Sequence, residues 1–253
     1  MNYVRQFIFA LTFLTRIPVP FKIEYNKKLP GRSMAFYPLV GIIIGVIVVL
    51  FDRCSMFIFS LPVRNTIVLI GFICVSGGLH LDGFMDTVDG IFSGRKSSRI
   101  KDIMHDSQIG AFGVIALFLL LLLKFNLLLE LQGVNRISVL IMMPALGRFM
   151  IILAAKYFPL SDSSKLGRDF IKGCDRIQVF ISCIWILFLF LCLYYFYSFS
   201  AIIFLIILSL CILISLIVGT AVVSKIDGLT GDVYGAISEI AEVVVLISFI
   251  TVS

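Results

Sequence analysis

Charge is what this sequence has least of. Asp, Glu, Lys and Arg make up 14% of its 253 residues, and hydrophobic residues make up 60%, whereas a soluble domain usually has about a quarter charged residues. The 48 residues from Ile177 to Ser224 contain none of these four residue types. Because a helix of about 20 apolar residues crosses a bilayer, this run is long enough for two crossings. The composition excludes a soluble domain and predicts an all-α, polytopic integral membrane protein.

Paired cysteines are also missing. The six cysteines show no CxxC spacing and most lie in apolar runs, which is typical of small packing residues rather than of disulfides or a metal cage. The net charge of +6 indicates no nucleic acid partner, because basic cytoplasmic loops of a membrane protein give the same excess. Repeats, low-complexity tracts and a soluble extension are not evident, so we expect one domain over residues 1–253.

Charge-poor windows predict about seven transmembrane helices and a short N-terminal helix. The N-terminal stretch is apolar but is interrupted by Arg16 and ends at Pro18 and Pro20 without a small-residue cleavage site. We therefore expect a short interfacial helix there rather than a signal peptide. The predicted crossings are approximately Ser33–Phe51, Asn65–Leu81, Ile109–Leu129, Ile137–Tyr157, Ile177–Tyr197, Ala201–Val222 and Val233–Val252.

The distribution of basic residues predicts the orientation. With these crossings, sixteen Lys and Arg residues fall on the side of the N-terminus and four on the other side. Cytoplasmic loops carry the excess of Lys and Arg, so the N-terminus is predicted to be cytoplasmic and the C-terminus outside. Outside the spans, the only acidic residues on the opposite side are Asp52 and Glu130. We therefore expect the chemistry of this protein to face the cytoplasm.

Three aspartates stand out directly after an apolar run. Asp82, Asp86 and Asp89 have the spacing i, i+4, i+7, which places all three carboxylates on one face of a helix. Such like charges repel unless a cation lies among them, and carboxylates with substrate phosphates are the ligands that Mg²⁺ prefers. The alternatives are an ordinary solvated loop and an ion-permeation site. The neighbouring His80 is more typical of a hydrogen-bonded residue at a helix end.

Two further polar clusters lie at the starts of predicted crossings. Asp106 and Ser107 precede Gly110 and Gly113, a position typical of a helix N-cap, although Asp106 is also a candidate oxygen ligand beside the first cluster.

The second of these clusters opens the final crossing, where Asp232, Glu239 and Glu242 fall near one helical face. Intramembrane glutamates need a cavity, a cation or a partner. A salt bridge to Arg148 is the main structural alternative to a ligand-binding role, and a guanidinium inside a crossing can also hold a phosphate.

These motifs together resemble a known family. "GGLHLDGFMDTVDGIFSGR", then "DSQIGAFG", then "GLTGDVYGAISEIAE", with "FLTRIPVP" and "FYPLVG" near the N-terminus, are similar in order and spacing to the cobalamin synthase family of adenosylcobinamide-GDP ribazoletransferases. The resemblance covers nearly the whole chain. It implies that the ribose 3′-hydroxyl of α-ribazole, or of its 5′-phosphate, attacks the pyrophosphate of adenosylcobinamide-GDP. GMP is released, and adenosylcobalamin or its 5′-phosphate is formed.

The resemblance also implies a setting and roles for individual residues. It implies a Mg²⁺-dependent enzyme in the bacterial inner membrane, in contact with lipid, with a homo-oligomer or a complex of pathway enzymes left open. The implied catalytic residues are Asp82, Asp86, Asp106 and Asp232, and the implied metal ligands are Asp82, Asp86 and Asp89. The implied substrate-binding residues are Arg16, Arg148, Ser107, Thr230, Glu239 and Glu242.

One rival function belongs to a different class. A cation transporter would also use carboxylates at a membrane, but its acidic residues would continue through the bilayer. Here the acidic residues gather at one predicted face and the opposite face has no matching set. We therefore expect a transferase, with the transporter as the alternative.

Overall fold

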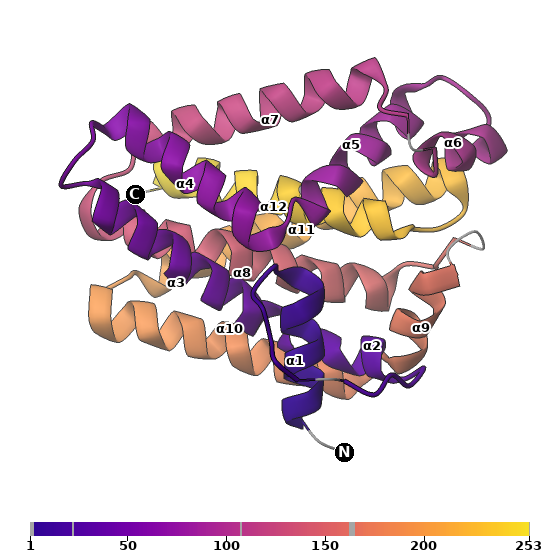
Figure 1. Ribbon diagram of the computed structural model, residues 1–253, viewed down its shortest axis with the longest axis horizontal. Coiled ribbons are helices and arrows are strands. Elements are labelled where there is room, and N and C mark those ends of the chain that lie inside the picture. Colours follow the sequence, from indigo (N-terminus) through magenta and orange to yellow (C-terminus); the bar gives the residue numbers. More distant parts are fainter. Residues whose placement is uncertain (1–2, 22, 107, 162–164, 253) are drawn as a thin grey trace.

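The computed structural model describes residues 3–21, 23–106, 108–161 and 165–252. The predicted all-α fold is confirmed, since long helices run side by side along the longest axis of the molecule (Figure 1). The helices are α1 (Tyr3–Leu14), α2 (Leu29–Ser33), η1 (Met34–Phe36), α3 (Tyr37–Ser55), α4 (Leu61–Ser76), α5 (Leu79–Phe92), α6 (Ser97–Met104), α7 (Ala111–Leu129), α8 (Gly133–Tyr157), α9 (Lys165–Gly173), α10 (Arg176–Tyr197), α11 (Ala201–Ile226) and α12 (Gly231–Val252).

The lengths of the helices make this a multi-pass membrane protein. Within the described residues, six helical segments are long and apolar enough to cross a bilayer, and the bent pair α4 and α5 gives a seventh if it counts as one span. The prediction of about seven crossings is therefore confirmed. The N-terminal helix α1 has only 12 residues, too few to span a bilayer as a helix, and it lies crosswise to the bundle (Figure 1).

Helix α8 forms the centre of the bundle, and nearly all of its side chains from Arg136 onward are buried. Helix α3 packs against it at glycine positions. A Cβ added to Gly41 would lie 2.4 Å from the Pro144 carbonyl oxygen, and one added to Gly45 would lie 2.5 Å from the Ile141 Cα. Small residues let transmembrane helices approach this closely, so α3 and α8 are held by backbone-to-backbone contact.

The second predicted crossing differs from a straight helix. The prediction ran one helix from Asn65 to Leu81, but α4 ends at Ser76 and α5 leaves it at an angle of 92°. Gly77 and Gly78 form the elbow, with φ of 69° and 71°. These left-handed conformations are unfavourable for residues with a Cβ, so two consecutive glycines allow the turn. All three aspartates of the first cluster consequently lie on α5.

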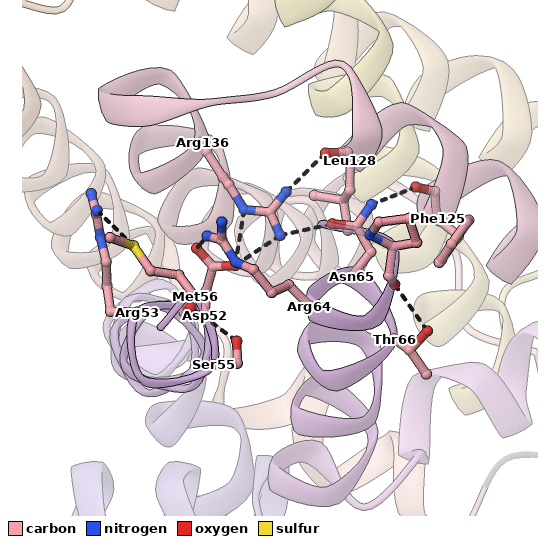
Figure 2. A network of polar contacts seen from close by, with 11 residues as sticks. Asp52, Arg53, Ser55, Met56, Arg64, Asn65, Thr66, Phe125, Leu128 and Arg136 are labelled. Atoms are coloured by element: carbon pink, nitrogen blue, oxygen red, sulfur yellow. Dashed lines mark hydrogen bonds and ion pairs between the residues drawn. The ribbon is translucent and has the colours of Figure 1, made fainter. Parts of the chain in front are cut away.

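A buried polar network joins α3, α4, α7 and α8 at the end of the bundle away from α5 (Figure 2). Asp52 accepts hydrogen bonds from Arg64 and Arg136, both at 2.8 Å. Arg136 also donates to the Asn65 side chain at 2.8 Å and to the Leu128 carbonyl at 2.8 Å. Each charged side chain of this network contacts one of opposite charge, as buried charges require. The network thereby holds the ends of these four helices together.

At the other end, α1, α2 and α9 form a small cap on the bundle. A Cβ on Gly31 of α2 would lie 2.2 Å from the Phe170 carbonyl oxygen of α9, so the two helices touch through backbone atoms. The segment after α1 is tied to the same place, because the Tyr25 hydroxyl donates to Asp169 at 2.6 Å. That hydrogen bond raises the pKa of Tyr25 above its ordinary value. The cap brings aromatic side chains from distant parts of the chain next to α5.

Candidate active site

Helices α5 and α12 pack tightly because two glycines lie at their crossing. A Cβ on Gly83 would lie 2.7 Å from the Asp232 carbonyl oxygen, and a Cβ on Gly235 would lie 3.1 Å from the Cα of His80. Contacts this short leave no room for a larger side chain. The first turn of α12 is therefore held directly against the aspartate-bearing helix.

This contact creates an acid cluster, defined here as Asp82, Asp86 and Asp232. Asp86 lies in the electrostatic field of Asp82, Asp232 and the nearby Asp89. The Asp82 side chain is exposed, whereas Asp86 and Asp232 are half-buried. The predicted gathering of aspartates thus includes residues of two helices that are far apart in the sequence.

Two neighbours act on Asp232. The fully buried Thr230 donates a hydrogen bond from its hydroxyl to the Asp232 carboxylate at 3.3 Å. This bond places Thr230 behind the carboxylate, so its direct contribution is to orient Asp232. His105, at the end of α6, lies near enough to Asp232 to interact with it electrostatically.

Asp89 has a structural partner that the sequence did not reveal. Its two carboxylate oxygens accept the backbone N–H groups of Gly110 at 3.0 Å and Gly113 at 2.8 Å. These are unpaired donors at the start of α7, so Asp89 caps α7 from a neighbouring helix. This role competes with the predicted metal ligation, since both oxygens of Asp89 are already engaged.

The N-cap of α7 is therefore not one of the two residues expected from the sequence. Asp106 was a cap candidate, but its side chain accepts the backbone N–H of Gln108 at 3.0 Å and forms a local turn before the helix. The N-cap position is Gly110, which offers no side-chain hydrogen bond. The other candidate, Ser107, lies outside the described residues.

Arg16 lies against the α4–α5 elbow. Its backbone N–H donates to the Val75 carbonyl at 2.8 Å, and a Cβ on Gly77 would lie 2.2 Å from the Arg16 Nε. The side chain is exposed. The elbow glycine therefore makes room for a cation beside the start of α5, the helix that carries Asp82, where it could offset the charge of a bound phosphate.

A cavity of about 240 Å³ opens beside the acid cluster. Asp82, Asp232 and His80 form part of its wall, and most of the remaining wall is apolar or aromatic. The lining residues are Phe13, Leu14, Met34, Tyr37, Leu79, His80, Asp82, Ile151, Ala155, Gly167, Phe170, Gly231, Asp232, Tyr234 and Gly235. Small-molecule sites have this combination of an apolar pocket with a few polar groups at one edge.

Three predicted substrate-binding residues lie elsewhere, in a buried ion-pair cluster made of Lys124, Arg148, Glu239 and Glu242. Lys124 donates to Glu239 and to Glu242, each at 2.6 Å, and Arg148 donates to Glu242. The four side chains are almost fully buried. The structure therefore contains the salt bridge named as the alternative for Arg148, and none of these four side chains lines the cavity beside the acid cluster.

Sequence reasoning missed Lys124. It was counted with the residues on the outer side of the membrane, but it lies within α7 and faces both glutamates. A lysine in the middle of the apolar stretch "LLLLLKFNLLL" was the available signal, because a charge within a span is retained only with a partner.

The acid cluster fits Mg²⁺ held jointly with a substrate. In the described parts of the chain, no three His, Cys, Asp or Glu side chains form a ready-made metal cage. Mg²⁺ is usually bound by one or two carboxylates plus waters and substrate phosphates. An open set of carboxylate oxygens on two helices, with Asp82 exposed, suits that mode better than a closed protein site.

Comparison with known proteins gives consistent matches over the whole chain. A protein from Fusobacterium nucleatum named adenosylcobinamide-GDP ribazoletransferase is 34% identical over 98% of this chain and 98% of its own length. A protein of the same name from Brevibacillus brevis is 35% identical over 95% of this chain and 96% of its own length. Another, from Thermoanaerobacter pseudethanolicus, is 30% identical over the full length of this chain and of its own. No solved structure matches the chain significantly.

The family comparison agrees with these relatives. The cobalamin-5-phosphate synthase family matches residues 6–250, a range that includes the acid cluster, the elbow and the ion-pair cluster. Since the relatives are named as transferases, the chain is an enzyme of that class. The match over nearly every residue shows that this chain belongs to the cobalamin-5-phosphate synthase family.

Proposed function

We propose that this protein is an adenosylcobinamide-GDP ribazoletransferase, catalysing the last assembly step of cobalamin. The ribose 3′-hydroxyl oxygen of α-ribazole, or of its 5′-phosphate, forms a bond to the phosphorus next to the cobinamide. The bond from that phosphorus to the bridging oxygen breaks, and GMP leaves with this oxygen. The hydroxyl proton passes to a base. Family membership and the names of the relatives support this reaction.

The observation that carries the proposal is the acid cluster at the edge of the cavity. A diphosphate transfer needs charge neutralisation at the phosphates and an acceptor for the hydroxyl proton, and the protein mainly supplies positioning and electrostatics. Asp82 and Asp232 both line the cavity, and Asp86 lies in their field. The carboxylates are therefore within reach of a substrate in the cavity and of the solvent-exposed edge.

In this proposal Asp82 and Asp86 of α5, with the support of Asp232, would hold Mg²⁺ together with substrate phosphates. When bound, the ion would offset the negative charge of the diphosphate and of the departing GMP. One of these three carboxylates also accepts the proton of the attacking hydroxyl. Arg16 contacts the diphosphate from the elbow, Thr230 holds Asp232 in place, and Asp106 remains a candidate at the exposed rim.

The enzyme is proposed to work at the cytoplasmic face of the bacterial inner membrane, with lipid around the bundle. The excess of Lys and Arg on the side of the N-terminus supports this orientation. Large side chains exposed on α7, α10 and α11, such as Phe118, Phe188 and Leu213, suit contact with acyl chains. Helix α5 and the first turn of α12, which carry the acid cluster, lie in the half of the bundle away from the C-terminus (Figure 1).

The test is GMP release by the purified protein in liposomes supplied with adenosylcobinamide-GDP, α-ribazole and Mg²⁺. We expect EDTA to abolish the release and Asp82→Ala to reduce it by at least about a hundredfold, the scale for a charge-stabilising group. Asp102→Ala is the matched control, because Asp102 is an exposed carboxylate on α6 that pairs with Arg99. Equal activity in the Asp82 and Asp102 variants would remove the metal assignment. Cation flux without GMP release would favour the transporter.

A further inference from the structure

The cavity beside the acid cluster has a wall that the diphosphate chemistry does not explain. Phe13 of α1 lies with its ring centroid 4.9 Å from that of Phe170 and 6.5 Å from that of Tyr37. Three aromatic rings from α1, α3 and α9 thus gather on one side of the cavity. Aromatic walls bind flat apolar rings well, because such rings stack or meet edge to face.

Two polar atoms of the same wall lack partners. The Tyr234 hydroxyl and the His80 Nδ1 are buried, and neither has a hydrogen-bond partner among the described residues. A buried polar group without a hydrogen bond is unfavourable, so these two atoms are candidates for contact with a ligand. Both residues line the cavity. Each of these side chains lines the cavity through other atoms, and its polar atom reaches a ligand only when the side chain turns towards the cavity.

We propose that this cavity binds the base of the attacking nucleoside, an apolar bicyclic aromatic ring with a hydrogen-bond acceptor. The inference rests on the proposed function. The base of α-ribazole, 5,6-dimethylbenzimidazole, is flat and mostly apolar and has one unsubstituted ring nitrogen, which can accept the hydrogen bond of the Tyr234 hydroxyl. The ribose attached to this base would extend towards Asp82 and Asp232, which form the polar edge of the cavity.

The size of the cavity agrees with one base and not with a whole corrinoid. An apolar cavity of about 150 Å³ accommodates a benzene ring, so about 240 Å³ leaves room for two fused rings. Pockets for larger ligands generally measure about 300–1,000 Å³. Guanine fits less well, because its edge carries several donors and acceptors that an apolar wall would leave unpaired.

The experiment compares the KM values of the two substrates in two variants. Ala155→Phe fills the cavity, since Ala155 is buried in its wall, and Tyr234→Phe removes only the unpartnered hydroxyl. We expect the KM for α-ribazole to rise at least about tenfold in Ala155→Phe and about fivefold to tenfold in Tyr234→Phe, the scale of one lost contact or hydrogen bond. The KM for adenosylcobinamide-GDP should stay within about twofold.

The controls are Ala221→Phe and Tyr194→Phe, which make the same changes at exposed positions on α11 and α10. We expect neither control to alter the KM for α-ribazole. A rise in the KM for adenosylcobinamide-GDP instead would assign the cavity to that substrate. Unchanged KM values in a folded Ala155→Phe protein would show that the cavity holds neither substrate, as expected for a space filled by a lipid chain.

Direct binding of the free base separates this inference from the proposed function. We expect 5,6-dimethylbenzimidazole to bind wild-type protein in nanodiscs and to bind Ala155→Phe at least about tenfold more weakly, measured by calorimetry. Wild-type protein that binds the base but releases no GMP would refute the proposed function and keep the binding site. Wild-type protein that releases GMP but binds the base no more tightly than Ala155→Phe does would refute the site alone.

Discussion

The Asp89 carboxylate of α5 accepts the backbone N–H of Gly113 in α7 at 2.8 Å, and its other oxygen accepts that of Gly110 at 3.0 Å. A carboxylate at the N-terminus of a helix satisfies free N–H groups and interacts favourably with the helix dipole. The same contact needs glycines, because a Cβ on either Gly110 or Gly113 would lie 2.3 Å from an Asp89 oxygen. Asp89 thus locks the position of α5 relative to α7.

Asp89→Ala should destabilise the protein. Loss of a helix cap that serves two N–H groups is expected to lower the free energy of unfolding by about 2 kcal/mol, which corresponds to a melting temperature about 4–8 °C lower for a chain of this size. Thermal unfolding in detergent measures this. Asp82→Ala is the comparison, since Asp82 is exposed and makes no such bond in the described structure. An Asp89→Ala protein that is fully stable yet inactive would show that metal binding is the main role of Asp89.

Gly83→Ala should force α5 and α12 apart. The added Cβ would meet backbone atoms of Asp232 at 2.7 and 2.8 Å, and backbone yields less than the end of a flexible side chain. We expect a loss of about 1–3 kcal/mol in stability, the scale of overpacking, together with weaker GMP release because the acid cluster is spread. Gly231→Ala is the stability control, since nothing lies within 4 Å of its added Cβ. Equal stability of the two variants would contradict the tight crossing.

Lys124→Met should lower the stability of the protein, even though it places an apolar methionine within an apolar helix. It leaves Glu239 and Glu242 with Arg148 as their only cation in the ion-pair cluster, and an uncompensated buried charge costs about 3–5 kcal/mol. The double variant Lys124→Met, Glu239→Gln restores charge balance and should recover much of the stability. Unfolding measurements on the two variants together with Glu239→Gln give the coupling between these side chains.

The same double variant tests the predicted substrate role of Glu239. If the cluster is structural, a folded Lys124→Met, Glu239→Gln protein should keep its KM values within about threefold. A folded protein with a large rise in one KM would show that Glu239 contacts that substrate.

Labelling with a membrane-impermeant maleimide should reveal the orientation. In a variant that keeps only Cys54, which is exposed at the end of α3, we expect labelling of intact cells from outside. In a cysteine-free protein with Arg99→Cys, an exposed position on α6, we expect labelling only after the membrane is opened. The reverse pattern would place the acid cluster outside and exclude cytoplasmic substrates.

The crossings were predictable from the sequence because bilayer thickness sets the length of an apolar run. The elbow was missed because the predicted crossing runs through Gly77 and Gly78 to Leu81, although a Gly-Gly pair is a typical turn signal. The spacing of Asp82 and Asp86 predicted a shared helical face correctly. Their approach to Asp232 depends on tertiary packing at Gly83, and this packing cannot be read from a single sequence.

The ion-pair cluster and the cavity show a similar limit. Glutamates inside the last span indicated a need for partners, and Arg148 was found as one of them. Lys124 was missed because counting charges by side of the membrane ignores which way a residue faces within the bundle. The cavity joins Phe13, Tyr37 and Phe170 from three distant segments, and no local pattern connects them.

The ion-pair cluster also has a consequence for biogenesis. The ribosome delivers α7 and α8, with Lys124 and Arg148, before α12, which carries Glu239 and Glu242. Until α12 enters the membrane, two cations of the nascent bundle lack their anions, and such charges are costly in hydrocarbon. Chains that end before α12 would therefore keep two cations without their anions inside the membrane. Quality control in the membrane could distinguish such chains from finished ones by these unpaired charges.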